Sequence, residues 1–238
     1  MKSFSEEWEK IHSTQEWGRY PSETVIRFIA RNYYKTEREK IKILDFGCGA
    51  GAHTWYLARE GFDVYAFDGS KSAVDKAEKY LEADGYKNVH FAVMDGAEIQ
   101  YEKDFFDCVV DSVCICANTK QNIQNMYKEV YDVLKTGGKL YTSCFGTKTQ
   151  GYGTGKCIEN GTYEDIESGV LAGRAIAHFF FKEELESTLK NINESKIKYD
   201  SKTRVAKLDK KMKIDFGGIA KGYTSSEVMK VFKNNGIK

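Results

Sequence analysis

From residue 41 onward, short apolar runs alternate with amphipathic segments. A short, continuous apolar run indicates a buried strand, whereas an apolar position every three or four residues indicates a helix. Their alternation predicts an α/β fold with a doubly wound, mostly parallel, Rossmann-like sheet covered by helices on both faces. The expected strands are 41–46, 63–68, 89–95, 107–114 and 139–144. The expected helices are 52–60, 70–83, 121–134 and 181–189.

The segment before residue 41 has a different pattern. It holds the only proline, Pro21, followed by Ser22, Glu23 and an apolar-periodic run over 25–29. This order predicts a helix that begins at a proline turn. We therefore expect three parts: an N-terminal helical cap over 1–40, a central domain over 41–195, and a C-terminal part over 196–238 that forms closing strands or an atypical basic tail.

The helix over 121–134 is expected to stop at Gly137-Gly138, just before the last expected strand. After that strand the sequence is less regular, with a glycine-rich stretch over 146–173. Two further extended segments are expected at 196–203 and 212–219. Residues 196–238 hold 12 Lys or Arg against 4 Asp or Glu, so with a net charge of +1 the first 195 residues are net acidic.

Bulk properties narrow the class of protein. With 238 residues, 41% hydrophobic and 30% charged, the chain suits one sizeable globular domain with a small appendage. It has no long apolar run and no apolar signal core at its start, so we expect a cytoplasmic protein with no membrane partner. The six cysteines lack the spacing of a zinc site and are expected to be reduced, packed thiols, with no metal.

The sharpest local signal is a glycine-rich turn at 43–51, where an apolar run leads directly into an amphipathic helix. Its glycines are Gly47, Gly49 and Gly51. Glycine permits a tight turn and the close approach of a ligand to the backbone. The spacing from Gly47 to Ala52 also fits the fingerprint of dinucleotide-binding proteins, so the turn alone indicates only a nucleotide-type site.

Acidic residues at strand ends distinguish a dinucleotide site, which binds a pyrophosphate, from a site for a ligand with a cationic amino group. Asp45 stands just before the turn, where a carboxylate would repel a pyrophosphate but attract a cationic amino group. Asp68 ends the second expected strand, where it can accept both hydroxyls of a ribose. Asp95 ends the third and can accept the exocyclic amine of adenine, with the Gly96 amide facing a ring nitrogen. Helix N-capping is an alternative for Asp68 and Asp95.

Together with the segment 106–111, these motifs resemble the class I S-adenosylmethionine (SAM)-dependent methyltransferases over about residues 41–190. The resemblance implies SAM as cofactor, S-adenosylhomocysteine as product, and methyl transfer to an oxygen or nitrogen of a small-molecule acceptor. It implies a ribose contact at Asp68, an adenine contact at Asp95 and Gly96, and a position near the sulfonium for Asp111 and Ser112. At the methionine end of the cofactor it implies contacts with Asp45, Gly47, Gly49 and Gly51. Their neighbours Cys48 and Gly69 are expected to contact the cofactor as well.

The segment 16–23 is similar to one that precedes the SAM motif in some small-molecule methyltransferases. Its chemistry suits a lid, in which Trp17 and Tyr20 cover the cofactor or acceptor and Arg19 meets a carboxylate. The alternative is an amphipathic helix start that packs Trp17 and Tyr20 on the core.

The acceptor pocket is expected beyond the carboxyl ends of the fourth and fifth strands. Methyl transfer requires mainly that the acceptor is held in line and kept dry. His178 is a candidate base and Asp111 a second candidate catalytic residue, although a structural role for His178 is the alternative. His53 is expected to be a surface or capping residue. The candidates for lining the pocket are Asp111, Cys114, Tyr152 and the run 178–181.

The segment 212–223 does not fit the last strand of such an enzyme. It is similar to a motif of the FAD:protein FMN transferases, and 227–236 continues that likeness. The match covers about 45 residues, and the chain lacks residues that the flavin and magnesium sites of that family need. A working flavin transferase is therefore not expected, and the tail is interpreted as closing strands, a foreign fragment or a flexible extension.

Two other functions remain compatible with the sequence: a SAM-binding protein without turnover, and an NAD-linked oxidoreductase. Nucleic acid is not expected as a partner, because an acidic surface repels phosphates. The turn after the fourth strand also lacks an Asn-Pro-Pro-Tyr-like tetrad. We expect a monomer or a homodimer with a small-molecule acceptor.

Overall fold

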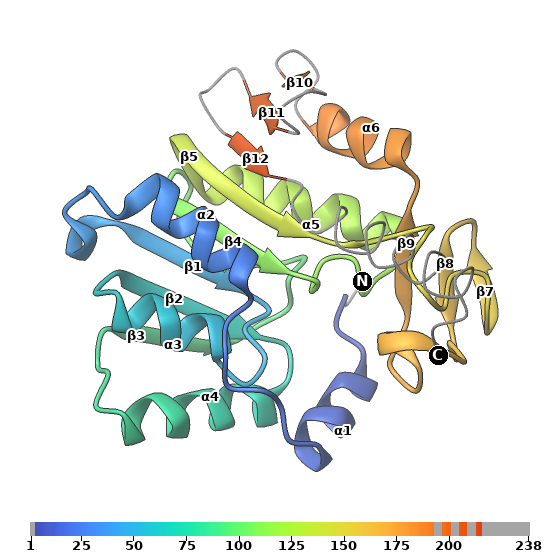
Figure 1. Ribbon diagram of the computed structural model, residues 1–238, viewed down its shortest axis with the longest axis horizontal. Helices are drawn as coiled ribbons and strands as arrows, with labels where there is room; N and C mark the ends of the chain where they lie inside the picture. Colours follow the sequence, from blue (N-terminus) through green and yellow to red (C-terminus); the bar gives the residue numbers. More distant parts are fainter. Residues whose placement is uncertain (1–2, 193–196, 201–204, 209–212, 216–238) are drawn as a thin grey trace, which may run out of the picture.

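The computed structural model describes residues 3–192, 197–200, 205–208 and 213–215. Its main sheet has eight strands in the order β10-β11-β12-β5-β4-β1-β2-β3 (Figure 1). The strands are β1 (Lys42–Phe46), β2 (Asp63–Asp68), β3 (Val89–Val93), β4 (Phe106–Ser112), β5 (Leu134–Ser143), β10 (Ile197–Asp200), β11 (Val205–Leu208) and β12 (Lys213–Asp215).

The sheet is parallel from β12 to β3, and its central strand β1 pairs with both β2 and β4. After β1 the chain builds β2 and β3 on one side, and then crosses to build β4 and β5 on the other. The carboxyl ends of β1 and β4 therefore form a topological switch point, where ligands bind in open α/β sheets. The predicted doubly wound, mostly parallel fold is confirmed.

Helices cover both faces because successive strand residues point in opposite directions. Ile43 packs with the group of helices that contains α2, α3 and α4, whereas Leu44 packs with α5 and α6. Both side chains are fully buried. The helices are α2 (Glu23–Tyr33), α3 (Ala52–Arg59), α4 (Lys71–Ala83), α5 (Lys120–Val133) and α6 (Lys182–Ile192), and a 3-10 turn, η1 (Arg38–Lys40), precedes β1.

An additional helix, α1 (Glu6–Thr14), lies within the expected N-terminal cap and beside α4 (Figure 1). The Glu9 carboxylate accepts hydrogen bonds from the Ser70 hydroxyl at 2.6 Å and the Ser72 amide at 3.2 Å. One turn further along α1, the Lys76 ammonium donates to the carbonyl oxygen of His12 at 2.6 Å. The middle and the C-terminal end of α1 are thus held to the first turns of α4.

The glycine-rich stretch after β5 forms a small sheet in the order β6-β9-β8-β7. Figure 1 shows it beyond the tips of β4 and β5. Its core is small and apolar, with Ile166, Leu171 and Phe179 buried. Its elements are β6 (Phe145–Gly146), β7 (Lys156–Glu159), β8 (Thr162–Glu164), η2 (Gly169–Leu171) and β9 (Ala177–Phe180).

The prediction that Gly137-Gly138 ends the helix before the last expected strand is wrong. Helix α5 ends at Val133, and β5 starts at Leu134 and runs through both glycines. Gly137 has a φ of 86°, and the pairing of β5 with β4 is irregular beside it. The glycines therefore bend a strand instead of ending a helix, as glycine often does at a bulge.

In the C-terminal part, β10 and β12 lie inside the two extended segments that the sequence predicts. The run 227–236 lies outside the described residues. Within the part of the chain that the structure describes, no helix is long and apolar enough to cross a membrane. All six cysteines are free, and Cys157 is exposed, which departs from the expected packing of every thiol.

Candidate functional site

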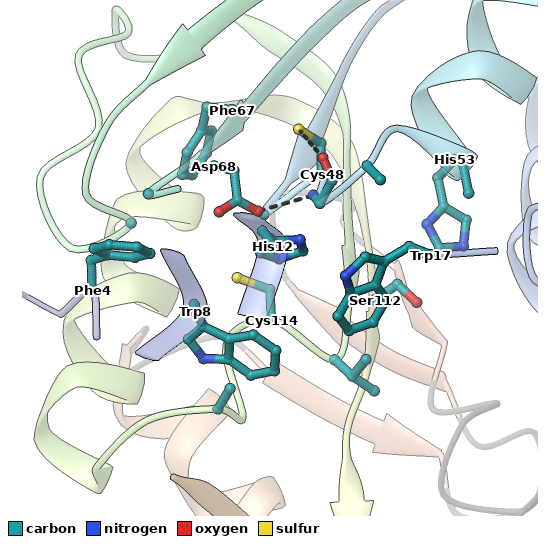
Figure 2. Close-up of a pocket in the computed structure, with 18 of the residues that line it drawn as sticks. Phe4, Trp8, His12, Trp17, Cys48, His53, Phe67, Asp68, Ser112 and Cys114 are labelled. Carbon is teal, nitrogen blue, oxygen red and sulfur yellow. Dashed lines mark hydrogen bonds between the residues drawn. The ribbon is translucent and has the colours of Figure 1, made fainter. Parts of the chain in front are cut away.

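A cavity of about 330 Å³ opens at the switch point of the sheet (Figure 2). Its walls come from the turns after β1, β2 and β4 and from N-terminal residues before α2. Small-molecule sites usually measure about 300–1,000 Å³ and have mostly apolar walls. The size and position of the cavity therefore suit one small ligand.

The three glycines of the first turn have three different roles. Gly47 has a φ of 68°, and a Cβ there would lie 2.1 Å from the Cys114 sulfur. Gly51, with a φ of 87°, packs against Ala77 of α4, which a Cβ would approach to 2.8 Å. Gly49 faces the cavity, where a Cβ would have only His12 nearby, at 3.6 Å. Gly47 and Gly51 permit close packing, and Gly49 leaves backbone open to a ligand.

Asp68 is the acidic residue that the structure places at the cavity wall. Its side chain accepts hydrogen bonds from the amides of Gly49 and Ser70, both at 2.9 Å. The cap of α4 is Ser70, whose hydroxyl accepts from the Ala73 amide at 3.1 Å. Burial raises the pKa of Asp68, while the two amides and nearby His12 oppose the rise. Asp68 thus bridges the first and second turns and remains available to a ligand.

Asp95 is occupied by the start of the chain. Its carboxylate accepts from the Ser3 amide at 2.7 Å, the Phe4 amide at 3.2 Å, the Ala97 amide at 2.9 Å and the Ser3 hydroxyl. Burial raises the pKa of Asp95, but these hydrogen bonds outweigh that effect and lower it. A carboxylate has about four acceptor positions. In this conformation, an adenine amine would therefore find none of them free.

Phe4 continues this N-terminal contact into the cavity. Its ring lies over Gly69, where a Cβ would come within 2.1 Å of the ring. Gly69 and Gly96 both line the cavity, and their expected contact with a ligand stays a prediction. We call residues 3–5 the N-terminal strap, because they cross from Asp95 to the start of α1 along the cavity wall.

Asp45 lies beneath the glycine turn and outside the cavity wall. Alternation along β1 turns its side chain to the face covered by α3, where it accepts a hydrogen bond from the Thr54 hydroxyl at 2.6 Å. It is 1% exposed, and burial raises its pKa. The expected direct contact with a ligand amino group has no support from this geometry.

Asp111 is likewise buried, although the sequence placed it near the reacting centre. It accepts hydrogen bonds from the amides of Cys114 and Ile115 at 3.0 and 3.1 Å, and from the Thr142 hydroxyl. The turn that it holds contains Val113, with a φ of 62°. A β-branched residue is rarely left-handed, and such strain concentrates at functional sites. Asp111 therefore positions the turn, and Ser112, Val113 and Cys114 line the cavity.

The burial of Asp111 predicts a pH effect on stability. Burial raises its pKa from 3.8 to about 6. The folded chain then holds the proton more tightly than the unfolded chain, so this contribution to stability is present at low pH and is lost as pH rises from about 4 to about 6. Between pH 4 and pH 7, Asp111→Asn should gain about 2 kcal/mol in unfolding free energy relative to the parent. Urea unfolding at each pH measures this difference.

The half-exposed Asp75 of α4 provides a control, since its ion pair with Lys71 is at the surface. The pH curve of Asp75→Asn should run parallel to that of the parent. Parallel curves for Asp111→Asn would contradict the buried, proton-binding carboxyl.

The predicted lid residues are only partly at the cavity. Trp17 and Tyr20 line it, but Tyr20 is 87% exposed. The Arg19 guanidinium instead lies over the Tyr80 ring, 4.9 Å from the ring centroid. The expected role of Arg19 in meeting a carboxylate at this site is therefore not supported. His53, expected at the surface or in a cap, lines the cavity and accepts a hydrogen bond from the Ser22 amide at 3.2 Å.

Helix α1 brings residues to the cavity that the sequence analysis missed. Trp8 and His12 both line it, and their ring centroids lie 6.0 Å apart (Figure 2). They are four residues apart and so share one face of a helix. That spacing was a usable signal, but the many charged residues around it concealed the helix.

His178 lies away from the cavity wall. Its Nδ1 is 2.7 Å from the Thr162 hydroxyl, and its Nε2 is 3.2 Å from Glu184 of α6. Burial lowers the pKa of His178. This position joins the small sheet to α6 and fits the structural alternative better than a catalytic base. Tyr152 packs on Tyr163 and Phe179 in the small sheet, so of the candidate pocket residues only Cys114 lines the cavity.

Part of the chain that forms this site matches a known protein family. Residues 43–138 match the family described as a methyltransferase domain. They span the glycine turn, Asp68, Asp95 and the turn after β4. In this region the chain therefore resembles methyltransferases with a class I fold. This confirms the predicted resemblance.

The alignments with curated relatives cover only part of this chain and only part of each relative. The chain is 34% identical over 110 residues to a ubiquinone biosynthesis O-methyltransferase from Rickettsia prowazekii, covering 45% of this chain and 42% of that protein. It is 31% identical over 117 residues to an arsenite methyltransferase from Rattus norvegicus, covering 44% and 31%. The aligned region thus spans less than half the length of these two proteins.

Among solved structures, a SAM-dependent methyltransferase from Methanosarcina mazei is similar, with 27% identity and a TM-score of 0.59. The match covers 76% of this chain and 88% of that one. Residues 169–238 match a second family, ApbE. That match confirms the predicted likeness of the C-terminal segment to FMN transferases, and it begins within the small sheet, upstream of the segment that the sequence analysis singled out.

Proposed function

We propose that this chain binds SAM in the cavity and transfers its methyl group to an oxygen or nitrogen of a small-molecule acceptor. The proposal rests mainly on the hydrogen bond between the Gly49 amide and the Asp68 carboxylate. It brings exposed backbone and a carboxylate together at the switch point of the sheet, within the region that matches methyltransferase domains. Bound SAM would supply an activated methyl group, so the protein need not generate one.

The residues present fit such a cofactor. Gly49 offers space for a ligand chain to pass close to the backbone. Asp68 has acceptor positions for two ribose hydroxyls beyond the two amides that it already binds. Burial raises the pKa of the Cys48 and Cys114 thiols well above the usual value, so both are neutral at physiological pH. The two thiols therefore add no charge to the wall beside the Asp68 carboxylate.

The acceptor is proposed at the side of the cavity formed by the turn after β4. Ser112 and Asn118 supply polar groups there, and Val113 and Met126 supply apolar surface. The two curated relatives described above act, by their names, in ubiquinone biosynthesis and on arsenite, so the relatives do not share one acceptor. We base the oxygen or nitrogen class on the sequence resemblance and on these polar groups.

Calorimetry with S-adenosylhomocysteine tests cofactor binding, and release of S-adenosylhomocysteine from SAM with a panel of phenols, amines and carboxylic acids tests transfer. We expect binding with a micromolar dissociation constant, and turnover with at least one class of acceptor. Binding without turnover on any acceptor would favour a SAM-binding protein. NADH binding without S-adenosylhomocysteine binding would refute the proposal in favour of an oxidoreductase.

The N-terminal strap leads to a separate prediction. If Asp95 accepts the adenine amine, Ser3 and Phe4 must first release it. A chain lacking residues 1–4 should therefore bind S-adenosylhomocysteine about five- to tenfold more tightly, because one competing set of hydrogen bonds is removed. Calorimetry measures this change, and Ser13→Ala, an exposed change on α1, is the control. Weaker binding after truncation would mean that the strap covers the cofactor instead of competing with it.

A further inference from the structure

Two buried ring nitrogens belong to residues that line the cavity. Nδ1 of His12 and Nε1 of Trp17 are both buried, and among the residues that the structure describes neither has a partner. His12 is 5% exposed, and its ring centroid lies 5.0 Å from that of Trp17. Both residues line the cavity. A buried donor without an acceptor is unfavourable, so the pair marks a place for a ligand group.

The chemistry of the pair selects the kind of group. The indole nitrogen of Trp17 is only a donor, and His12 donates from Nδ1 in one of its two neutral tautomers. Two neighbouring donors suit a group with two acceptor oxygens. Burial lowers the pKa of His12, which keeps the ring neutral near pH 7.

Charges around the pair do not exclude an anion. Asp68 and Glu9 act on His12 with negative charge, and Lys76 and Arg174 act on it with positive charge. Lys76 is held at the carbonyl oxygens of α1, and the Arg174 guanidinium lies over the Trp17 ring, 4.5 Å from the ring centroid. The two cations balance the two carboxylates, and the cation over Trp17 favours an anionic group on that side.

We propose that His12 and Trp17 form a carboxylate subsite of this cavity. Figure 2 shows His12 between Asp68 and Trp17, and a Cβ on Gly49 would lie 3.6 Å from the His12 ring. The inference rests on the proposed function, because the carboxylate has two possible sources: the amino-acid end of the cofactor or a carboxylate on the acceptor. The subsite also takes over the role that the sequence analysis gave to Arg19.

Matched ligands distinguish these sources. S-adenosylhomocysteine carries the amino-acid end, whereas methylthioadenosine has the same nucleoside and sulfur without it. Trp17→Phe removes the N–H and keeps an aromatic ring. If the subsite holds the cofactor, Trp17→Phe and His12→Leu should each raise the dissociation constant of S-adenosylhomocysteine about tenfold and leave that of methylthioadenosine unchanged. His12→Asn, which retains a donor near the position of Nδ1, should recover part of the loss.

A second arm tests the acceptor. Benzoate, a planar carboxylate, is titrated into the full chain loaded with S-adenosylhomocysteine. If the subsite serves the acceptor, both variants should lose benzoate binding and retain affinity for S-adenosylhomocysteine. Ser13→Ala is the control, since Ser13 is exposed on the same helix and outside the cavity wall. It should leave all three affinities unchanged.

The inference is overturned if Trp17→Phe and His12→Leu change the affinities for both nucleosides equally, or change neither these nor benzoate binding. If the parent chain binds neither nucleoside, the proposed function fails instead, and benzoate binding to the unloaded chain then decides the subsite alone. Thermal unfolding of each variant verifies that the fold is retained.

Discussion

Replacing Asp68 with alanine should lower the affinity for S-adenosylhomocysteine at least about a hundredfold, which calorimetry measures. Hydrogen bonds to a charged group contribute about 1.5–3 kcal/mol each, and the variant loses those that two ribose hydroxyls would make. It also leaves the amides of Gly49 and Ser70 without their acceptor, so the unfolding free energy should fall by about 1–3 kcal/mol.

Two controls separate binding from folding. Asp68→Asn keeps one acceptor oxygen for the amides and should be more stable than Asp68→Ala while still binding weakly. Asp75→Asn, on the surface of α4, should match the parent in both measurements. An Asp68→Ala chain that bound S-adenosylhomocysteine as tightly as the parent would remove the main support for the proposed cofactor site.

Gly47→Ala should cause the largest loss of stability among the glycine variants of the first turn. The φ of 68° alone costs an alanine about 1–2 kcal/mol, and its Cβ would overlap the Cys114 sulfur at 2.1 Å. We expect the unfolding free energy to fall by about 3–4 kcal/mol, measured by urea unfolding. Cofactor affinity should fall as well, because the turn carries Gly49.

Gly61→Ala isolates the contribution of the backbone. Gly61 has a φ of 85°, but a Cβ there meets nothing within 4 Å, so the variant should lose only about 1–2 kcal/mol. Adding Cys114→Gly to Gly47→Ala removes both close contacts and should make the double variant more stable than the sum of the two single changes predicts. Equal losses at Gly47 and Gly61 would contradict the role of close packing with Cys114.

Local sequence patterns predicted the parts of the fold that depend on neighbouring residues. The strand ending at Phe46, the glycine turn and the strand ending at Asp68 follow from apolar periodicity and from the conformational demands of glycine. The same patterns placed Asp68 at the site, because strand ends meet at one edge of a parallel sheet.

Contacts between distant segments were not predictable in this way. Asp45 and Asp111 carry chemistry that suits the site, but the alternation of β1 and the turn after β4 bury them, and burial depends on helices elsewhere in the chain. The strap residues reach Asp95 across about ninety positions of sequence. His12 was missed because four of the nine residues of α1 are charged and the helix is held in place by hydrogen bonds to α4, which a local pattern does not reveal.

One contiguous stretch of chain, residues 3–20, supplies the N-terminal side of the cavity, while the sheet supplies the rest. Helix α1 is held to α4 through Glu9 and Lys76, not through the main apolar core. Residues 3–20 can therefore be replaced together as one segment. A chimaera that takes only this stretch from a methyltransferase with a similar sheet would change the shape of the binding chamber and keep the glycine turn and the sheet intact.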